Sequence, residues 1–190
     1  MTHGAPRDTL DVALRIATAL DAAGTPYALG GAIAYGIWAV PRATADVDIN
    51  VFVGGEELKR VFSVLESLGI ELDRVDAAVK SDRDGVFFAR WGGIRIDVFT
   101  PSIDFSREAE RTRVRREIRG QPAWFLCAES IAVFKLLFFR GKDLLDLERL
   151  VAVHTELDVA RVRAHIVEMM GADDERVARW DQIVAGFRSH

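Results

Sequence analysis

Two aspartates alternate with apolar residues in the segment DVDINVFV, which spans residues 46–53. In a β-strand, Asp46 and Asp48 project from the same face, roughly 6–7 Å apart along the backbone. Like charges this close repel each other unless a cation or a hydrogen-bond donor compensates them. Mg²⁺ prefers hard oxygen ligands and often uses one or two carboxylates together with substrate phosphates. The spacing therefore indicates a divalent-metal site.

A third aspartate, Asp97, lies on the polar face of a later alternating strand, within GVFFARWGGIRIDVFT (residues 85–100). If that strand lies beside the first, three carboxylates converge. Two metal ions about 3.5–4 Å apart, held in this way, can clamp the attacking and leaving oxygens of an in-line phosphoryl displacement. The alternative for Asp46 and Asp48 is an exposed strand edge whose charges discourage edge-to-edge pairing. The otherwise apolar strand favours the metal site.

Paired glycines, Gly30 and Gly31, precede these aspartates at a predicted strand-to-helix turn. Glycine lets the backbone approach a phosphate without an intervening Cβ, and the N–H groups at a helix N-terminus attract an anion. Arg42 and Thr44, in the loop VPRATA, are candidate contacts to a phosphate or a base. The simpler interpretation is that the glycines only form a turn and that Arg42 and Thr44 are ordinary loop residues.

Lys135 interrupts the apolar face of a predicted helix in AESIAVFKLLFFRGKDLLDLERL (residues 128–150). Either its stem packs while its ammonium group reaches water, or the ammonium group neutralises a triphosphate in a cleft. Asp143 and Asp146 share one face of the next predicted helix. Lys142 and Asp146 form a predicted i, i+4 pair, which is typical of a salt-bridged solvent face.

The order of these residues resembles the signature of the DNA polymerase β-type nucleotidyltransferase superfamily, which is Gly30-Gly31, then Asp46-Val47-Asp48 in a strand, then Asp97 in a later strand. The pattern GG…G…PRATADVDI is most similar to small prokaryotic members, the nucleotidyltransferase toxins of the abortive-infection type II group. The resemblance covers about residues 25–150. It implies two Mg²⁺ ions held by the three aspartates, Asp97 as base for the acceptor hydroxyl, and a nucleoside triphosphate held by the glycine turn.

In the toxin group, a similar lysine is followed by an arginine, a Lys-Asp pair and a further aspartate. The resemblance therefore adds Lys135 and Asp146 as expected site residues, with Lys135 also contacting the nucleotide. It leaves Arg140, Lys142 and Asp143 as further candidates.

Hydrophobic periodicity predicts strands and helices in the first half of the chain and helices alone near its end. Expected strands lie in PYALGG, DVDINVFV and PAWFLC and in a hairpin that turns at Gly92-Gly93. Expected helices cover about residues 9–23, 32–39, 55–69, 129–140, 142–154, 158–170 and 173–187. This order predicts an α/β fold: a nucleotidyltransferase-type mixed sheet lobe with flanking helices over residues 1–104, and a mostly helical C-terminal lobe over residues 105–190 that completes the cleft.

The 190-residue chain is 49% hydrophobic and has one cysteine, Cys127, so we expect a folded core in a reducing compartment, which favours the cytoplasm. The first ten residues lack the basic and apolar regions of a secretory signal. The longest apolar run, residues 131–139, is interrupted by Lys135 and is too short to span a bilayer, so no membrane partner is expected. A net charge of −4 argues against a broadly basic protein that coats nucleic acid, but it allows a local basic patch.

Three hypotheses for the function follow. The first is Mg²⁺-dependent transfer of a nucleoside monophosphate from a triphosphate to a hydroxyl, by a toxin that modifies RNA at the tRNA 3′ end and has a cognate antitoxin as partner. Six arginines between residues 107 and 119 would then dock the RNA, although a solvated face is the simpler explanation. The second is nucleotidyl transfer to a small molecule such as an aminoglycoside or lincosamide antibiotic. The third is a catalytically silent nucleotide-binding or protein-binding module.

Overall fold

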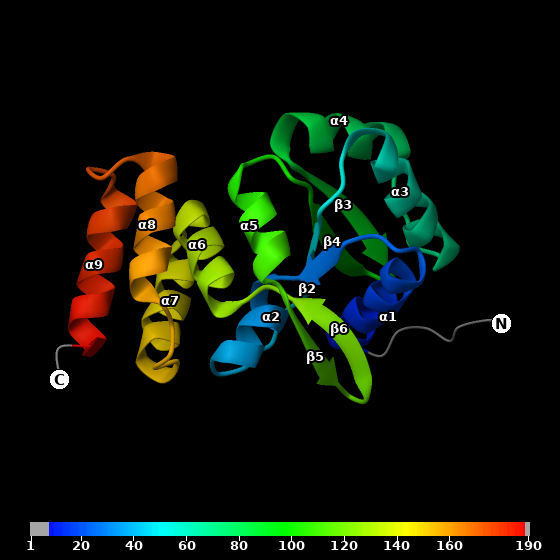
Figure 1. Cartoon of the computed structure of the whole chain (residues 1–190). Coiled ribbons are helices and arrows are strands. Elements are labelled where there is room, and N and C mark those ends of the chain that lie inside the picture. Colours follow the sequence, from blue (N-terminus) through cyan, green and yellow to red (C-terminus); the bar gives the residue numbers. More distant parts are fainter. Residues whose placement is uncertain (1–7, 189–190) are drawn as a thin grey trace. The chain divides into compact units, whose positions relative to one another are not determined.

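The computed structural model describes residues 8–188, and the chain divides into two compact units (Figure 1). The first unit comprises the chain up to Ala34 together with Arg42–Leu126, and the second comprises Tyr35–Pro41 and the chain from Cys127 onward. The predicted boundary after residue 104 differs from this division, because the next segment adds two strands to the sheet. The predicted lack of a secretory signal concerns residues 1–7 as well, which lie outside the described residues.

Within residues 8–188, the first unit contains one six-stranded mixed sheet with the order β3-β4-β2-β1-β6-β5. Its strands are β1 (Tyr27–Leu29), β2 (Asp46–Val51), β3 (Val86–Trp91), β4 (Ile94–Phe99), β5 (Val114–Ile118) and β6 (Gln121–Phe125). The neighbours β2 and β4 are parallel, as are β1 and β6, whereas β1–β2, β3–β4 and β5–β6 are antiparallel. The expected mixed α/β sheet is confirmed, and so is the hairpin turn at Gly92-Gly93.

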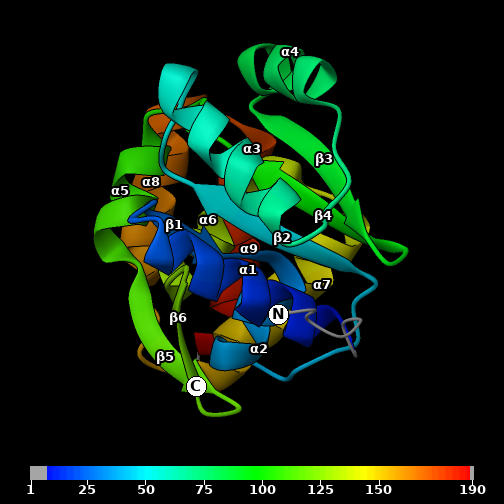
Figure 2. The same ribbon diagram turned by 90° about the vertical axis from the view of Figure 1, so that its right-hand side faces the viewer.

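Helices cover one face of this sheet. Figure 2 shows α1 and α3 on the same face, where the rings of Phe62 and Phe87 meet edge to face at 5.3 Å. Val47, Ile49 and Val51 of β2 are fully buried below these helices, as their alternation predicts. The helices that begin in this unit are α1 (Thr9–Ala22), α2 (Gly31–Trp38), the 3-10 helix η1 (Gly55–Glu57), α3 (Leu58–Ser67), α4 (Arg74–Asp84) and α5 (Phe105–Thr112).

The helix α4, which packs beside β3, is absent from the sequence prediction. Only Ala77 of its side chains is buried, so its sequence carries almost no apolar periodicity. Its ends are nevertheless marked, because Asp73 accepts hydrogen bonds from the N–H groups of Val75 and Asp76, and Gly85 ends the helix with φ +68°.

The second unit contains four consecutive helices, coloured yellow-green to red in Figure 1: α6 (Ala128–Phe138), α7 (Gly141–Val153), α8 (Val159–Met170) and α9 (Glu175–Arg188). The helix α6 packs against α7 and α8, and α9 packs against α7 and α8. Trp180 of α9 is 1% exposed, and its indole N–H donates to the carbonyl of Val159 at 3.0 Å. None of the helices within residues 8–188 combines the length and the apolar character needed to cross a membrane.

Candidate active site

The parallel pairing of β2 with β4 brings the three predicted aspartates to one face of the sheet. Asp48 is directly opposite Asp97, and Asp46 is opposite Arg95. Paired residues of adjacent strands project from the same face, and the strands lie about 4.8 Å apart. The strand-edge interpretation of Asp46 and Asp48 is wrong, because β2 lies inside the sheet between β4 and β1.

Two of these carboxylates are held by neighbouring side chains. The hydroxyl of Thr44 donates to the Asp46 carboxylate. The guanidinium of Arg95 donates two hydrogen bonds to Asp97, at 2.5 and 3.0 Å. These hydrogen bonds, together with the charges of Asp97, Asp46 and Asp48, raise the pKa of Arg95. Arg95 is therefore a cation that offsets part of the negative charge of this face.

The glycine turn lies directly against Asp48. The N–H of Gly30 donates to the Asp48 carbonyl at 2.9 Å, and α2 begins at the next residue. Gly31 has φ +50°, and a Cβ at Gly31 would overlap the Asp48 carboxylate. Glycine is required here for both its backbone conformation and its missing side chain. The first turn of α2, whose N–H groups attract anions, therefore begins beside a carboxylate.

The three aspartates have the ligand chemistry of a magnesium site, since they offer only carboxylate oxygens. In the described part of the chain, however, no three His, Cys, Asp or Glu side chains already lie together as a ligand group. Asp97 faces Arg95, and Asp46 accepts from Thr44. The backbone positions suit a shared metal site, and Asp97 must turn from Arg95 to complete it.

The two loop candidates differ in their surroundings. Thr44 is half-buried, and its carbonyl accepts a hydrogen bond from the Thr9 hydroxyl at 3.3 Å. Since its own hydroxyl donates to Asp46, Thr44 orients that carboxylate, a contact that the sequence did not predict. Arg42 is exposed. A role of either residue in nucleotide binding stays a prediction.

Lys135 and its partners form a buried ionic cluster within the second unit. The ammonium group of Lys135 lies 2.6 Å from Asp146 and 3.5 Å from Asp143, and 5.2 Å from the ring centre of Tyr35. The three charged side chains are only 2–7% exposed. The interpretation of Lys135 as a lysine whose head reaches water is therefore wrong. Its charge is offset by two carboxylates.

The other candidates on α7 adjoin this cluster. The guanidinium of Arg140 donates to Asp143 at 2.6 Å, and the backbone N–H of Arg140 also donates to the Asp143 carboxylate, at 3.3 Å, at the start of the helix. The predicted pair between Lys142 and Asp146 is wrong, because Asp146 turns inward to Lys135 while Lys142 is exposed and has no ion pair with residues 8–188. Asp143 and Asp146 do share one helix face, as predicted.

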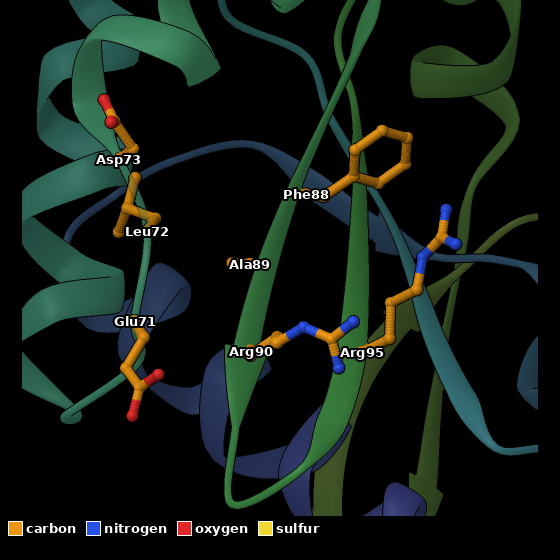
Figure 3. Close-up of a pocket in the computed structure, with 7 residues that line it drawn as sticks. All are labelled: Glu71, Leu72, Asp73, Phe88, Ala89, Arg90 and Arg95. Atoms are coloured by element: carbon orange, nitrogen blue, oxygen red, sulfur yellow. The ribbon is translucent and has the colours of Figure 1, made fainter.

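A hollow beside the aspartates contains residues that the sequence analysis did not select. It has a volume of about 440 Å³, and its lining includes Phe88 and Arg90 of β3 and Arg95 of β4 (Figure 3). The segment before α4 contributes Glu71, Leu72 and Asp73. The alternation of polar and apolar residues in β3 and β4 could have identified Phe88 and Arg95, since it places them on the same face as Asp97.

The arginine-rich segment carries less uncompensated charge than its composition suggests. Four of its six arginines form ion pairs, which are Arg111–Glu108, Arg113–Glu110, Arg115–Asp21 and Arg119–Asp8. Arg113 and Arg115 also lie over the ring of Trp124, at 4.8 and 5.6 Å. Arg107 is exposed and has no ion pair with residues 8–188. Most of this segment is a paired, solvated surface.

Comparison with known proteins identifies the type of fold. No family model matches the chain, and no curated protein matches it in sequence. Among solved structures, the antibiotic-resistance factor ANT(2'')-Ia is 20% identical with a TM-score of 0.51, over 96% of this chain and 93% of that one. An antigenic nucleotidyltransferase-like protein from Paracoccidioides brasiliensis is 16% identical with a TM-score of 0.52, over 98% and 99% of the two chains.

A Thermotoga maritima protein provisionally described as a nucleotidyltransferase is 14% identical with a TM-score of 0.50, over 77% of this chain and 94% of that one. Two of these three structures are described as a nucleotidyltransferase or as similar to one, and the matches extend over most of the described residues. The chain therefore has a nucleotidyltransferase fold, as the sequence predicted.

Proposed function

We propose that this protein is a Mg²⁺-dependent nucleotidyltransferase, which moves a nucleoside monophosphate from a nucleoside triphosphate to an acceptor hydroxyl. The observation that carries the proposal is the register of β2 with β4, which aligns Asp46, Asp48 and Asp97 on one sheet face beside the corner at Gly30 and Gly31. The two strands supply carboxylate oxygens for the metal, and the glycine turn supplies backbone N–H groups for the phosphates of a metal-bound triphosphate.

In this proposal Asp46, Asp48 and Asp97 hold magnesium, which when bound stabilises negative charge on the transferring phosphoryl group. The backbone at Gly31 and the first turn of α2 orient the triphosphate. Asp97 accepts the proton of the acceptor hydroxyl. A bond forms between that oxygen and the α-phosphorus, the bond from the α-phosphorus to the bridging oxygen breaks, and pyrophosphate leaves. Thr44 positions Asp46 through its hydrogen bond.

The role of Asp146 is proposed from the sequence resemblance. That of Lys135 rests on the resemblance together with its charge, and that of Arg42 near the nucleotide rests on its place in the loop that follows the glycine turn. The buried contact between Lys135 and Asp146 favours an indirect role, in which the pair fixes α6 against α7. Arg140, Lys142 and Asp143 are proposed only as neighbours of that pair.

For the acceptor we propose RNA, at the tRNA 3′ end, and with it a toxin role and a cognate antitoxin as partner. This choice rests on the similarity to the toxin group and on the cations beside Asp97. The second candidate is an aminoglycoside or lincosamide antibiotic, and the likeness to the antibiotic-resistance factor ANT(2'')-Ia favours it. Growth arrest on expression, relieved by an adjacent gene product, would support the toxin role.

The test is nucleotidyl transfer by the purified protein. With Mg²⁺, α-labelled triphosphates and total tRNA, label should enter RNA, and Asp48→Asn should lower the rate at least about a hundredfold, because metal stabilisation of the transition state is worth several kcal/mol. The control is Asp82→Asn, at an exposed aspartate of α4.

Two other results would change the assignment. Label in an aminoglycoside and not in RNA would establish the second candidate. If the wild-type protein transfers nothing and no triphosphate raises its melting temperature, the chain is a silent module, since any ligand of the folded state must stabilise it.

A further inference from the structure

The hollow next to the aspartates is joined to them by strand register. Phe88 of β3 is directly opposite Asp97 of β4, and Asp97 is directly opposite Asp48 of β2. In the adjacent row, Arg90 is opposite Arg95. Because paired residues share a face, Phe88 and Arg90 extend the aspartate face toward the edge of the sheet. Figure 3 shows Phe88, Arg90 and Arg95 emerging on the same side of the hairpin.

Phe88 offers a partly exposed aromatic ring with two cations near it. Its side chain is 40% exposed although both neighbours in β3, Phe87 and Ala89, are buried. Arg95 lies 4.4 Å and Lys80 lies 5.5 Å from the centre of its ring. Exposed aromatic rings beside arginine and lysine are typical of surfaces that stack the bases of single-stranded nucleic acids.

Arg90 is the cation of the hollow that can receive a phosphate directly. Arg90 is exposed and forms no ion pair with the described residues, so its guanidinium is available for a phosphate. Asp73 already accepts two backbone hydrogen bonds at the start of α4. Glu71 is exposed as well, and its backbone exchanges hydrogen bonds of 2.8 and 2.9 Å with that of Arg90.

We propose that this hollow is the acceptor site and that it binds a nucleotide of single-stranded RNA. The base stacks on Phe88, while Arg90 holds a phosphate and Arg95 holds another once Asp97 turns to the metal. This inference rests on the proposed function, since Asp97 is the group that would take the proton of the acceptor hydroxyl. An acceptor bound on Phe88 presents its ribose along the row that leads to Asp97.

The chemistry of these residues favours a nucleotide over the antibiotic acceptor. An aminoglycoside has no aromatic ring to stack on Phe88, and it offers no anionic group to the guanidinium groups of Arg90 and Arg95. A nucleotide offers a base to Phe88 and a phosphate to Arg90.

The test measures RNA binding separately from transfer. The probe is a fluorescent single-stranded RNA of about eight nucleotides, a length within the usual site size, titrated without triphosphate. Phe88→Leu should weaken its binding about tenfold, whereas Phe88→Trp should retain it, since one base–aromatic stack is lost only in the first variant. Arg90→Gln should weaken binding and lower the slope of log K against log salt by roughly 0.7. Arg60→Gln, at another exposed arginine that pairs with no carboxylate in the described part of the chain, is the control.

The outcomes separate this inference from the proposed function. Unchanged RNA affinity in Phe88→Leu and Arg90→Gln, in a protein whose transfer depends on Asp48, would overturn the acceptor site alone. Loss of triphosphate affinity with RNA affinity retained would assign the hollow to the donor nucleotide and overturn it as well. If transfer does not depend on Asp48, the proposed function fails whatever Phe88 does. A melting temperature within a few degrees of wild type is required of each variant.

Discussion

The two units each contain a cluster of carboxylates with a cation, and the clusters differ in how the charge is enclosed. In the sheet unit, Asp97 is 14% exposed and its partner Arg95 is 49% exposed. In the helical unit, Lys135 and Asp146 are 7% and 4% exposed. A partly exposed pair can exchange one partner for a ligand at little free-energy cost, whereas a buried pair cannot. The sheet cluster is therefore suited to ligand exchange, and the helical cluster to holding helices together.

The largest effect is expected from opening the buried cluster. Lys135→Met leaves the Asp146 carboxylate buried without its cation, so the free energy of unfolding should fall by about 3 kcal/mol. Urea unfolding measures the change. Lys142→Met, at an exposed residue of α7 that has no ion pair within residues 8–188, should change stability by less than about 0.5 kcal/mol.

This experiment can also contradict the proposed difference between the two clusters. If Lys135→Met keeps its stability and instead loses triphosphate affinity, then the helical cluster exchanges its partner for a ligand just as the sheet cluster does, and Lys135 contacts the nucleotide directly.

An intermediate effect is expected at the glycine corner. Gly31→Ala should cost about 2 kcal/mol of stability and abolish triphosphate binding, because the new methyl group meets the Asp48 carboxylate at a positive φ. Gly55→Ala is a matched control, since Gly55 has φ +55° with open space around it. It should cost about 1 kcal/mol through backbone strain alone and leave nucleotide affinity unchanged. Calorimetric titration with a non-hydrolysable triphosphate distinguishes the two variants.

The smallest effect is expected from removing the exchangeable partner of the sheet cluster. Arg95→Gln removes a cation that competes with metal for Asp97, so Mn²⁺ or Mg²⁺ should bind up to about fivefold more tightly. The variant should at the same time bind RNA more weakly. Isothermal titration without nucleotide gives the metal affinity, and Arg60→Gln serves again as control. Weaker metal binding in Arg95→Gln would contradict the idea that Arg95 occupies the position of the metal.

The sequence predicted an element correctly where the pattern within that element alone determines its structure. The alternation of β2 and β4 fixed the face of Asp46, Asp48 and Asp97, and the paired glycines at 92 and 93 fixed the hairpin. The helix α4 was missed because a helix on a sheet edge needs little apolar surface, and only the caps at Asp73 and Gly85 marked it.

The sequence was less able to predict which charged side chains of different elements form ion pairs. The i, i+4 spacing of Lys142 and Asp146 suggested a surface pair, but the packing of α6 on α7 turned Asp146 toward Lys135, eleven residues earlier. Arg95 and Asp97 lie two residues apart on one strand face, so their ion pair was within reach of the sequence pattern. That this ion pair places a cation among the proposed metal ligands could be seen only from the register of β2 with β4.

The division of the chain has a practical consequence for anyone who wishes to exchange parts of it. The path leaves the sheet unit at Ala34, returns at Arg42 and leaves again at Leu126, so no single cut separates the two units. A fragment that stops at Leu126 would retain Tyr35, a fully buried ring, while losing the lysine that lies over it. Chimeras with related proteins should therefore transfer the seven-residue excursion Tyr35–Pro41 together with the helices from Cys127 onward.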